Sequence, residues 1–481
     1  MNSVKNRDIT SLSNLHSLYF VGIKGIAMAS LAVWAKEKGC QVIGSDVGDE
    51  FPSDIVLHDK GIQVLKGFDA HNISSHIKPD LIIYTGAHGG RDNPEVVEGR
   101  KLGIPTLPHG KALGLAMSGK RQISVAGSHG KTTTTAIIAT ILISAGVDPS
   151  YAIGCGKVRG LGPPGHFGRG DYFIAEADEY VTDPTHDPTP RFLWQTPEIL
   201  VVTNVDYDHP DAYSSLTAVQ RAFQKLLQRQ IGRKICIVNI DDPASHGLLK
   251  KSGNSTIITY GSSDKARYQA KHISFERGKT TFEIYRDKGG IGIFTIYVPG
   301  VHNVLNALAA AVASHEAGLS WEQVRLGLSR FRGAKRRFEE IGQAHGVTFF
   351  DDYAHHPKEI AATLAAVRSW YPKDRVIAVF QPHTYSRTKS LLSEFGLAFK
   401  DADIVVTTDI YGSARETETL GMTGEVFANE VKKHKNVVCY AQNSEAVYAV
   451  LASMIKKDDI VIFMGAGNIY LWGKEIYKSI T

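Results

Sequence analysis

Short apolar segments alternate with helical patterns along most of the chain. The segments predicted as strands span residues 17–22, 41–44, 63–65, 80–85, 123–126, 171–175, 198–203, 235–239, 347–352, 376–380, 403–408 and 459–464. The segments predicted as helices span residues 29–37, 136–145, 216–228 and 304–317. Strands that alternate with helices predict an α/β fold built on parallel sheets. Residues 272–298 differ, because apolar and polar positions alternate there around two glycine turns, which predicts antiparallel hairpins.

The length and the order of these patterns predict a division into three domains. A chain of 481 residues corresponds to about three domains. We place them at residues 1–117, 118–330 and 331–481, with a glycine- and proline-rich loop at 154–170 and a proline- and aspartate-rich loop at 180–192 inside the second.

Bulk composition narrows the class of protein. Hydrophobic content of 43% and charged content of 21% are typical of a soluble globular protein. A net charge of +5 does not indicate nucleic-acid binding. No apolar run approaches the roughly 20 residues of a membrane span, and residues 1–14 lack the apolar core of a signal peptide. The four scattered cysteines favour a reducing compartment, so we expect a cytoplasmic protein.

The most informative stretch is Ile-Ser-Val-Ala-Gly-Ser-His-Gly-Lys-Thr-Thr-Thr at residues 123–134. A strand, a turn with Gly127 and Gly130, and a helix start form a cradle of backbone N–H groups that suits phosphate. Lys131 adds a positive charge, and Thr132 offers a hydroxyl to magnesium. The strict P-loop pattern fails because Val125 stands where a glycine is expected.

Acidic residues follow the neighbouring predicted strands. Glu176, Asp178 and Glu179 come directly after one strand, and residues 204–209 (Asn-Val-Asp-Tyr-Asp-His) follow the next. Carboxylates at strand ends beside a phosphate loop suit magnesium, which prefers oxygen ligands. We therefore predict a ligand role for Glu176 and for His209.

The N-terminal stretch has the pattern of a nucleotide-binding βαβ unit. A turn with Gly22 and Gly25 precedes a helix, and Asp46 ends the next strand. Lys24 stands where a second glycine would let the backbone approach a pyrophosphate. A dinucleotide-dependent oxidoreductase is thus one alternative, although it gives the phosphate loop no role. A non-catalytic nucleotide-binding module is another, and Lys131, Glu176 and His209 together argue against it.

Six motifs in this order resemble the Mur ligases, the ATP-dependent amide-forming enzymes of peptidoglycan synthesis. They are residues 127–133, 176–179, 204–209, 302–307 (His-Asn-Val-Leu-Asn-Ala), 335–338 (Lys-Arg-Arg-Phe) and 352–357 (Asp-Tyr-Ala-His-His-Pro). The resemblance implies an N-terminal Rossmann-like domain that binds a UDP-sugar, a central P-loop-like ATPase domain, and a C-terminal Rossmann-like domain that closes over ATP and the amino acid.

The resemblance also implies the substrates. The lactyl carboxylate of UDP-N-acetylmuramate would be activated by ATP and joined to an amino donor. Residues 380–388 and 465–470 resemble family members that use L-alanine, whereas Glu-Ala-Asp-Glu-Tyr at 176–180 resembles members that use the L-Ala-γ-D-Glu-diaminopimelate tripeptide. We expect L-alanine, with the tripeptide as the alternative, and a monomer or weak homodimer.

Roles carried over from the family fall on four groups of residues. The expected ATP-binding residues are Gly127, Ser128, His129, Gly130, Lys131, Thr132, Thr133, Asn303, Arg336, Asp352 and His356. The expected magnesium ligands are Thr132, Glu176 and His209, and the expected UDP-sugar residues are Gly22, Gly25, Ile26, Asp46 and His88. The expected catalytic residues are Lys131, Glu176, His209, His383 and Arg387.

Overall fold

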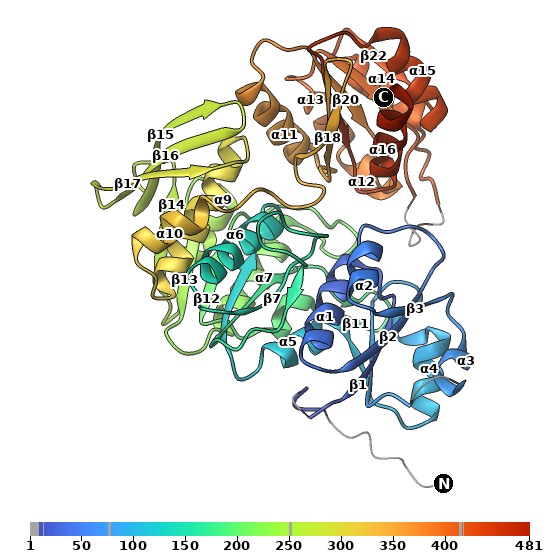
Figure 1. Ribbon diagram of the computed structural model, residues 1–481, viewed down its shortest axis with the longest axis vertical. Helices are drawn as coiled ribbons and strands as arrows, with labels where there is room; N and C mark the ends of the chain where they lie inside the picture. The colour runs from blue at the N-terminus through green and yellow to red at the C-terminus, as the bar shows by residue number, and fades with distance from the viewer. Residues whose placement is uncertain (1–8, 13, 76–77, 250–252, 413–415, 417) are drawn as a thin grey trace.

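The structure is a computed structural model that describes residues 9–12, 14–75, 78–249, 253–412, 416 and 418–481. Residues 1–8, part of the segment expected to lack a signal peptide, lie outside the described residues. Three large sheets follow one another along the chain, and the domains built on the N-terminal and C-terminal sheets each lie beside the central domain (Figure 1). None of the helices in the described ranges is long and apolar enough to cross a membrane.

The N-terminal sheet is parallel and has the order β3-β2-β1-β4-β5. Its elements are β1 (Ser17–Val21), α1 (Ile26–Glu37), β2 (Gln41–Asp46), α2 (Asp54–Asp59), β3 (Gln63–Lys66), α3 (Ala70–Ser75), β4 (Leu81–Tyr84), η1 (Gly90–Asp92), α4 (Pro94–Lys101), β5 (Thr106–Pro108) and α5 (His109–Met117). The predicted βαβ unit is therefore present. Parallel strands share one carboxyl edge, so Gly22 and Asp46 lie at the same end of the sheet.

The central sheet has the order β17-β16-β15-β14-β13-β12-β6-β9-β7-β8. Its first elements are β6 (Arg121–Ala126), α6 (Lys131–Ser144), β7 (Ser150–Ala152), β8 (Gly165–His166), β9 (Tyr172–Ala177), β10 (Val181–Asp183), β11 (Asp187–Pro190), η2 (Arg191–Trp194), β12 (Ile199–Val202) and α7 (Leu216–Gln228). The rest are β13 (Ile235–Asn239), η3 (Pro243–Ser245), α8 (His246–Leu249), β14 (Thr256–Gly261), β15 (Tyr268–Glu276), β16 (Lys279–Arg286), β17 (Gly289–Ile296), α9 (Val301–Glu316) and α10 (Trp321–Leu328).

The centre of this sheet is buried because apolar strands and two largely buried helices pack on each other. Strands β6, β9 and β12 are parallel and almost entirely buried. Helices α6 and α9 lie in the same apolar core as Ile123, Ile174 and Val201. This packing fixes the N-terminus of α6 at the carboxyl edge of the sheet. The predicted hairpins are confirmed as β15, β16 and β17, which pair antiparallel.

Two segments predicted as loops contain strands. Residues 154–170 include β8, which pairs with β7 beside α1. The proline- and aspartate-rich segment after Glu179 forms the hairpin β10–β11, whose Asp183 carboxylate accepts a hydrogen bond from the Arg91 backbone N–H. These strands are short and gain their order from the N-terminal domain, so their own sequence carries little periodic signal.

The C-terminal sheet has the order β18-β19-β23-β20-β21-β22, and only its edge strand β18 is antiparallel among the strands described. Its elements are β18 (Glu339–Ala344), β19 (Val347–Asp352), α11 (Pro357–Trp370), β20 (Val376–Phe380), α12 (Tyr385–Ser390), α13 (Leu392–Leu397), β21 (Ile404–Thr407), α14 (Gly424–Lys432), β22 (Val438–Tyr440), α15 (Ser444–Met454), β23 (Ile460–Met464) and α16 (Ile469–Ile480). The fold is the predicted three-part α/β architecture.

Candidate functional site

The turn between β6 and α6 requires glycine at its first and last positions. Gly127 has φ 142°, and a Cβ there would lie 2.0 Å from the Thr203 hydroxyl oxygen. Gly130 has φ 82°, and a Cβ there would lie 2.5 Å from a side-chain oxygen of Asn306. Side chains other than glycine rarely adopt such φ values. The turn therefore exposes backbone at the start of α6, where the helix dipole favours an anion.

Lys131, the first residue of α6, lies between backbone carbonyls and acidic side chains. Its Nζ donates to the Gly127 carbonyl at 2.5 Å and to Oε2 of Glu179 at 2.9 Å. Burial opposes the charged form, but Glu179 and Asp178 outweigh it and raise the pKa of Lys131. The ammonium therefore stays charged beside the phosphate turn.

Glu176 is the penultimate residue of strand β9 and connects three parts of the central domain. Its Oε2 accepts a hydrogen bond from the Thr132 hydroxyl at 3.1 Å, and its Oε1 accepts one from the Gly154 backbone N–H at 2.5 Å. Burial raises the pKa of Glu176, although Lys131 acts in the opposite direction. The predicted pair Thr132 and Glu176 is thus brought together.

A second group of possible metal ligands lies beside Lys131. Glu179, Asp208 and His209 each offer an atom, all within 4.8 Å of one another. Oε1 of Glu179 is buried and has no hydrogen-bond partner among the residues described, and it lies 3.8 Å from Nε2 of His209. An orphaned carboxylate oxygen in a set of two carboxylates and one imidazole fits a divalent cation such as magnesium.

Two cavities meet at the phosphate turn. The first, of 240 Å³, lies between α9 and the start of α11, and it is lined by Asn303, Asn306, Arg337, Asp352 and Thr363 among others. The second, of 260 Å³, is bordered by all three domains, and it is lined by Ile26, Lys131, Glu176, His209, Arg336 and Tyr353 among others. His129, Gly130, Arg337 and Glu359 line both. The two cavities therefore adjoin along the phosphate turn.

Polar groups in the first cavity are held by the backbone around them. Asn303 donates to the Pro299 carbonyl at 2.7 Å. The carboxylate of Asp352 accepts hydrogen bonds from the backbone N–H groups of Phe338 and Ala354, at 2.7 and 2.8 Å. Burial raises the pKa of Asp352, while Arg337 lowers it by less. Both predicted side chains thus lie in one cavity with fixed orientations.

The two arginines of the basic segment at residues 335–337 have different surroundings. Arg336 has φ 61°, and its Nη2 donates to the Gly465 carbonyl at 2.6 Å while its Nε lies 3.3 Å from Asp351. Arg337 instead lines both cavities. The arginine that faces the first cavity is therefore Arg337, the neighbour of the residue singled out from the sequence.

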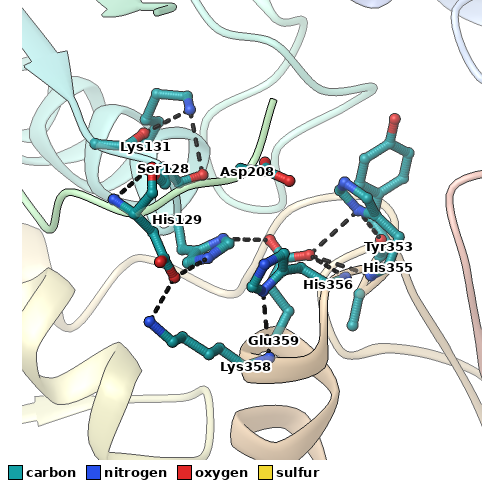
Figure 2. A network of polar contacts seen from close by, with 12 residues as sticks. Ser128, His129, Lys131, Asp208, Tyr353, His355, His356, Lys358 and Glu359 are labelled. Carbon is teal, nitrogen blue, oxygen red and sulfur yellow. Dashed lines mark hydrogen bonds and ion pairs between the residues drawn. The ribbon is translucent and has the colours of Figure 1, made fainter. Parts of the chain in front are cut away.

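The C-terminal domain contacts the central domain through charged side chains at the phosphate turn (Figure 2). Arg387 of α12 lies 3.2 Å from Asp208, and Lys358 of α11 lies 2.6 Å from Asp206. The Arg387 charge, set against burial, holds the pKa of Asp208 well below its ordinary value. These contacts bring the third domain onto the second, as the predicted closure requires.

His383 and His356 of the C-terminal domain make different contacts. His383 Nδ1 is 3.4 Å from a guanidinium nitrogen of Arg387, and its ring stacks on Tyr411 with centroids 5.8 Å apart. The ring of His356 packs against that of His129, with centroids 4.8 Å apart. Arg387 and His383 therefore form one unit near Asp208, apart from the first cavity.

The predicted UDP-sugar residues share the carboxyl end of the N-terminal sheet. Asp46 accepts the backbone N–H of Lys24 at 2.7 Å, and its carboxylate lies 3.9 Å from His88. A Cβ at Gly22 would lie 2.4 Å from the Thr85 side chain. The Lys24 ammonium reaches Asp54 at 3.3 Å. The lysine in the glycine turn is thus engaged within its own domain.

Four side chains at the site were not singled out from the sequence as site residues. Glu179 and Asp208 stand beside the predicted Glu176 and His209, and Arg337 stands beside Arg336. Glu359 lies in the first turn of α11, three residues after His356. Its one sequence signal is the helix-start pattern, which indicates capping rather than a site.

Comparisons with known proteins match three parts of the chain to models of one family. The Mur ligase family catalytic domain matches residues 17–121, the Mur ligase middle domain matches 169–314, and the Mur ligase glutamate ligase domain matches 336–467. A UDP-N-acetylmuramate–L-alanine ligase of Desulfitobacterium hafniense is 39% identical over 95% of this chain and 99% of its own length. One of Aquifex aeolicus is 35% identical over 97% of this chain and 98% of its own.

Solved structures give the same result for the fold. The UDP-N-acetylmuramate-alanine ligase of Thermotoga maritima superposes with a TM-score of 0.80 at 25% identity, covering 97% of this chain and 99% of its own. A murein peptide ligase of Psychrobacter arcticus superposes with a TM-score of 0.71 at 23% identity, covering 97% and 98%. The curated relatives extend along nearly the whole sequence, and the family models match three separate parts of it. The chain therefore belongs to the Mur ligase family.

Proposed function

We propose that this protein joins L-alanine to the lactyl carboxylate of UDP-N-acetylmuramate, using ATP, in peptidoglycan precursor synthesis. The observation that carries the proposal is the convergence of Lys131, Glu176 and His209 on a cavity that all three domains border. The curated relatives at 35–39% identity, named as L-alanine ligases, support the choice of substrates. An oxidoreductase would leave Lys131 and Glu176 without a role.

In the proposed reaction, the lactyl carboxylate attacks the γ-phosphorus of ATP. This step releases ADP and forms an acyl phosphate. The amine of L-alanine then attacks the acyl carbon, phosphate leaves, and the amine loses its proton. Phosphoryl transfer needs charge neutralisation and positioning rather than a protein nucleophile. The contacts between the second and third domains would limit hydrolysis of the acyl phosphate by water.

The chain's own residues take complementary parts. The turn from Gly127 to Gly130 and the charged Lys131 would hold the β- and γ-phosphates. Asn303 and Asp352 would bind the adenine and ribose in the first cavity. Arg387 and His383 would bind the alanine carboxylate and the transferring phosphate.

Thr132, Glu176 and His209, with Glu179 and Asp208 beside them, would hold magnesium. When bound, magnesium would neutralise charge on the phosphate oxygens. On the other side of the second cavity, Gly22, Gly25, Ile26, Asp46 and His88 would bind the UDP-sugar. The cytoplasmic location and the monomer or weak homodimer stay predictions.

One observation keeps the tripeptide as a second candidate donor. Tyr180, where the sequence resembles tripeptide-using members, is buried with its hydroxyl 2.6 Å from Asp211 and its ring 4.9 Å from that of His209. A residue this close to a proposed metal ligand is placed to influence the donor. ADP release measured with UDP-N-acetylmuramate, ATP and magnesium, with either donor added separately, decides between the two.

A further inference from the structure

Glu359 belongs to a charged cluster between the second and third domains and contacts residues of both. We call His129, Asp206, His356, Lys358 and Glu359 the seam cluster. Oε1 of Glu359 lies 3.3 Å from Nδ1 of His129, and the other ring nitrogen of His129 lies 3.5 Å from Asp206. Figure 2 shows the side chains of His129 and Glu359 pointing toward each other from the two domains.

The second carboxylate oxygen of Glu359 is used within its own domain. Oε2 accepts hydrogen bonds from the backbone N–H groups of His355 and His356, at 3.1 and 3.3 Å, and lies 3.2 Å from Nδ1 of His355. The same side chain thus fixes the start of α11 with one oxygen and contacts the phosphate turn with the other. That geometry couples the orientation of α11 to the position of His129.

His129 is in turn fixed to the central sheet. Its backbone N–H donates to Oδ1 of Asn204 at 2.9 Å, and its carbonyl accepts from the Asn204 amide at 2.9 Å. A displacement of the His129 side chain therefore strains the turn that precedes Lys131. His129 lies in the phosphate turn, two residues before Lys131, so a change in its contacts shifts the backbone that would bind phosphate.

The negative charge of Glu359 lies close to the proposed phosphate site. Glu359 lines both cavities, where a polyphosphate would be repelled by a free negative charge. The Glu359 side chain is only 12% exposed, and His129 and Arg337, whose Nη1 is 3.8 Å away, balance its charge. Burying a carboxylate between cations costs free energy of desolvation, and removing one of the partners leaves an uncompensated buried charge.

We infer that Glu359 is a positioning residue that fastens the third domain to the phosphate turn through His129, so that both present one ATP site. This inference rests on the proposed function. In it, Glu359 touches no reacting atom, and it acts on ATP through His129 and Arg337. Loss of its charge then weakens ATP binding more than it changes the binding of the UDP-sugar.

Helix capping alone is the competing explanation, and Glu359→Gln separates the two. Glutamine caps the start of a helix as glutamate does, so the capping hydrogen bonds to residues 355 and 356 are kept. The charge facing His129 is removed. Glu445→Gln is a matched control, because Glu445 lies in the first turn of α15 in the same domain and is exposed.

The experiment compares these variants with the wild-type chain by calorimetric titration of a non-hydrolysable ATP analogue with magnesium, and by steady-state kinetics. We expect Glu359→Gln to raise the Kd and the KM for ATP about tenfold, with the KM for UDP-N-acetylmuramate changed less than about twofold. Glu445→Gln keeps wild-type values. Unchanged ATP affinity in Glu359→Gln, or an equal rise in both KM values, overturns the inference.

A double-mutant cycle tests the route through His129. If the two side chains act as one unit, Glu359→Gln combined with His129→Asn weakens ATP binding little more than His129→Asn alone. Effects that multiply would show that Glu359 acts independently of His129 and would contradict the inference. A wild-type chain that bound no ATP analogue would instead refute the proposed function, so the two failures are distinguishable.

Discussion

The ammonium of Lys131 lies 2.9 Å from the carboxylate of Glu179, and both side chains are largely buried at the carboxyl edge of the central sheet. Glu179 follows β9, and Lys131 begins α6, so neighbouring elements of one domain supply the two charges. The pair places a charged lysine beside the phosphate turn and an acidic group beside His209. In the proposed mechanism, these are the positions of the polyphosphate and the magnesium.

Replacing Lys131 with alanine should lower kcat by about 10²–10³-fold, the scale observed when one charge-stabilising donor is lost from an active site. The measurement is ADP release under saturating substrates. Lys432→Ala, an exposed lysine in α14, is the control and should behave as wild type. Near-full ligation by Lys131→Ala would refute the assignment of the phosphate turn.

Glu176→Gln should raise the magnesium concentration needed for half-maximal activity by at least about tenfold, because it removes a charged oxygen from the proposed ligand set. A magnesium titration at saturating ATP measures this. The exposed Glu394→Gln in α13 serves for comparison. An unchanged magnesium requirement would mean that the contact between Glu176 and Thr132 is purely structural.

Tyr180 tests the link between the hairpin β10–β11 and His209. Tyr180→Phe removes the hydrogen bond to Asp211 and keeps the ring, whereas Tyr180→Ala removes both. We expect kcat of Tyr180→Ala to fall about three- to tenfold below that of Tyr180→Phe, the scale of one aromatic contact. Tyr448→Ala in α15, 39% exposed, should have no effect. Equal kcat for the two Tyr180 variants would show that its ring does not position His209.

The seam cluster predicts a pH dependence of stability. Burial alone would lower the pKa of His129, but Asp206 and Glu359 raise it from 6.5 to about 10. Because the folded-state pKa is the higher one, this contribution to the free energy of unfolding is complete below pH of about 6.5 and is lost as the pH rises through about 10.

The midpoint of thermal unfolding, followed across this range, measures the effect. It should fall more steeply with pH in the wild type than in His129→Asn, with His345→Asn in an exposed turn as the control. Parallel curves for wild type and His129→Asn would show that the ring carries no extra proton in the folded state.

Local sequence patterns predicted most of the architecture because burial is periodic. The strand at 235–239 and the helix at 216–228 have the predicted bounds, since the strand is apolar up to its last residue and the helix has a single apolar face. The hairpin β10–β11 was missed because Asp183 and its neighbours are ordered by contacts with Arg91, far away in the sequence. Periodicity carries no information about such a contact.

The site was predictable only where chemistry follows a local motif. Gly127, Lys131 and Thr132 are recognisable because a strand, a turn and a helix follow one another directly. Arg336 and Arg337 point to different places because Arg336 has a positive φ. The local sequence does not indicate that backbone angle. Glu359 has the sequence context of a helix cap, and its contact with His129 exists only when two domains meet.

The central claim is tested most directly by ADP release from the wild-type chain with UDP-N-acetylmuramate, ATP and magnesium. L-alanine and the L-Ala-γ-D-Glu-diaminopimelate tripeptide are added in separate reactions. The account predicts turnover that depends on L-alanine and does not require the tripeptide. Turnover with the tripeptide only would contradict the proposed donor, and the absence of turnover with either would contradict the proposed ligation.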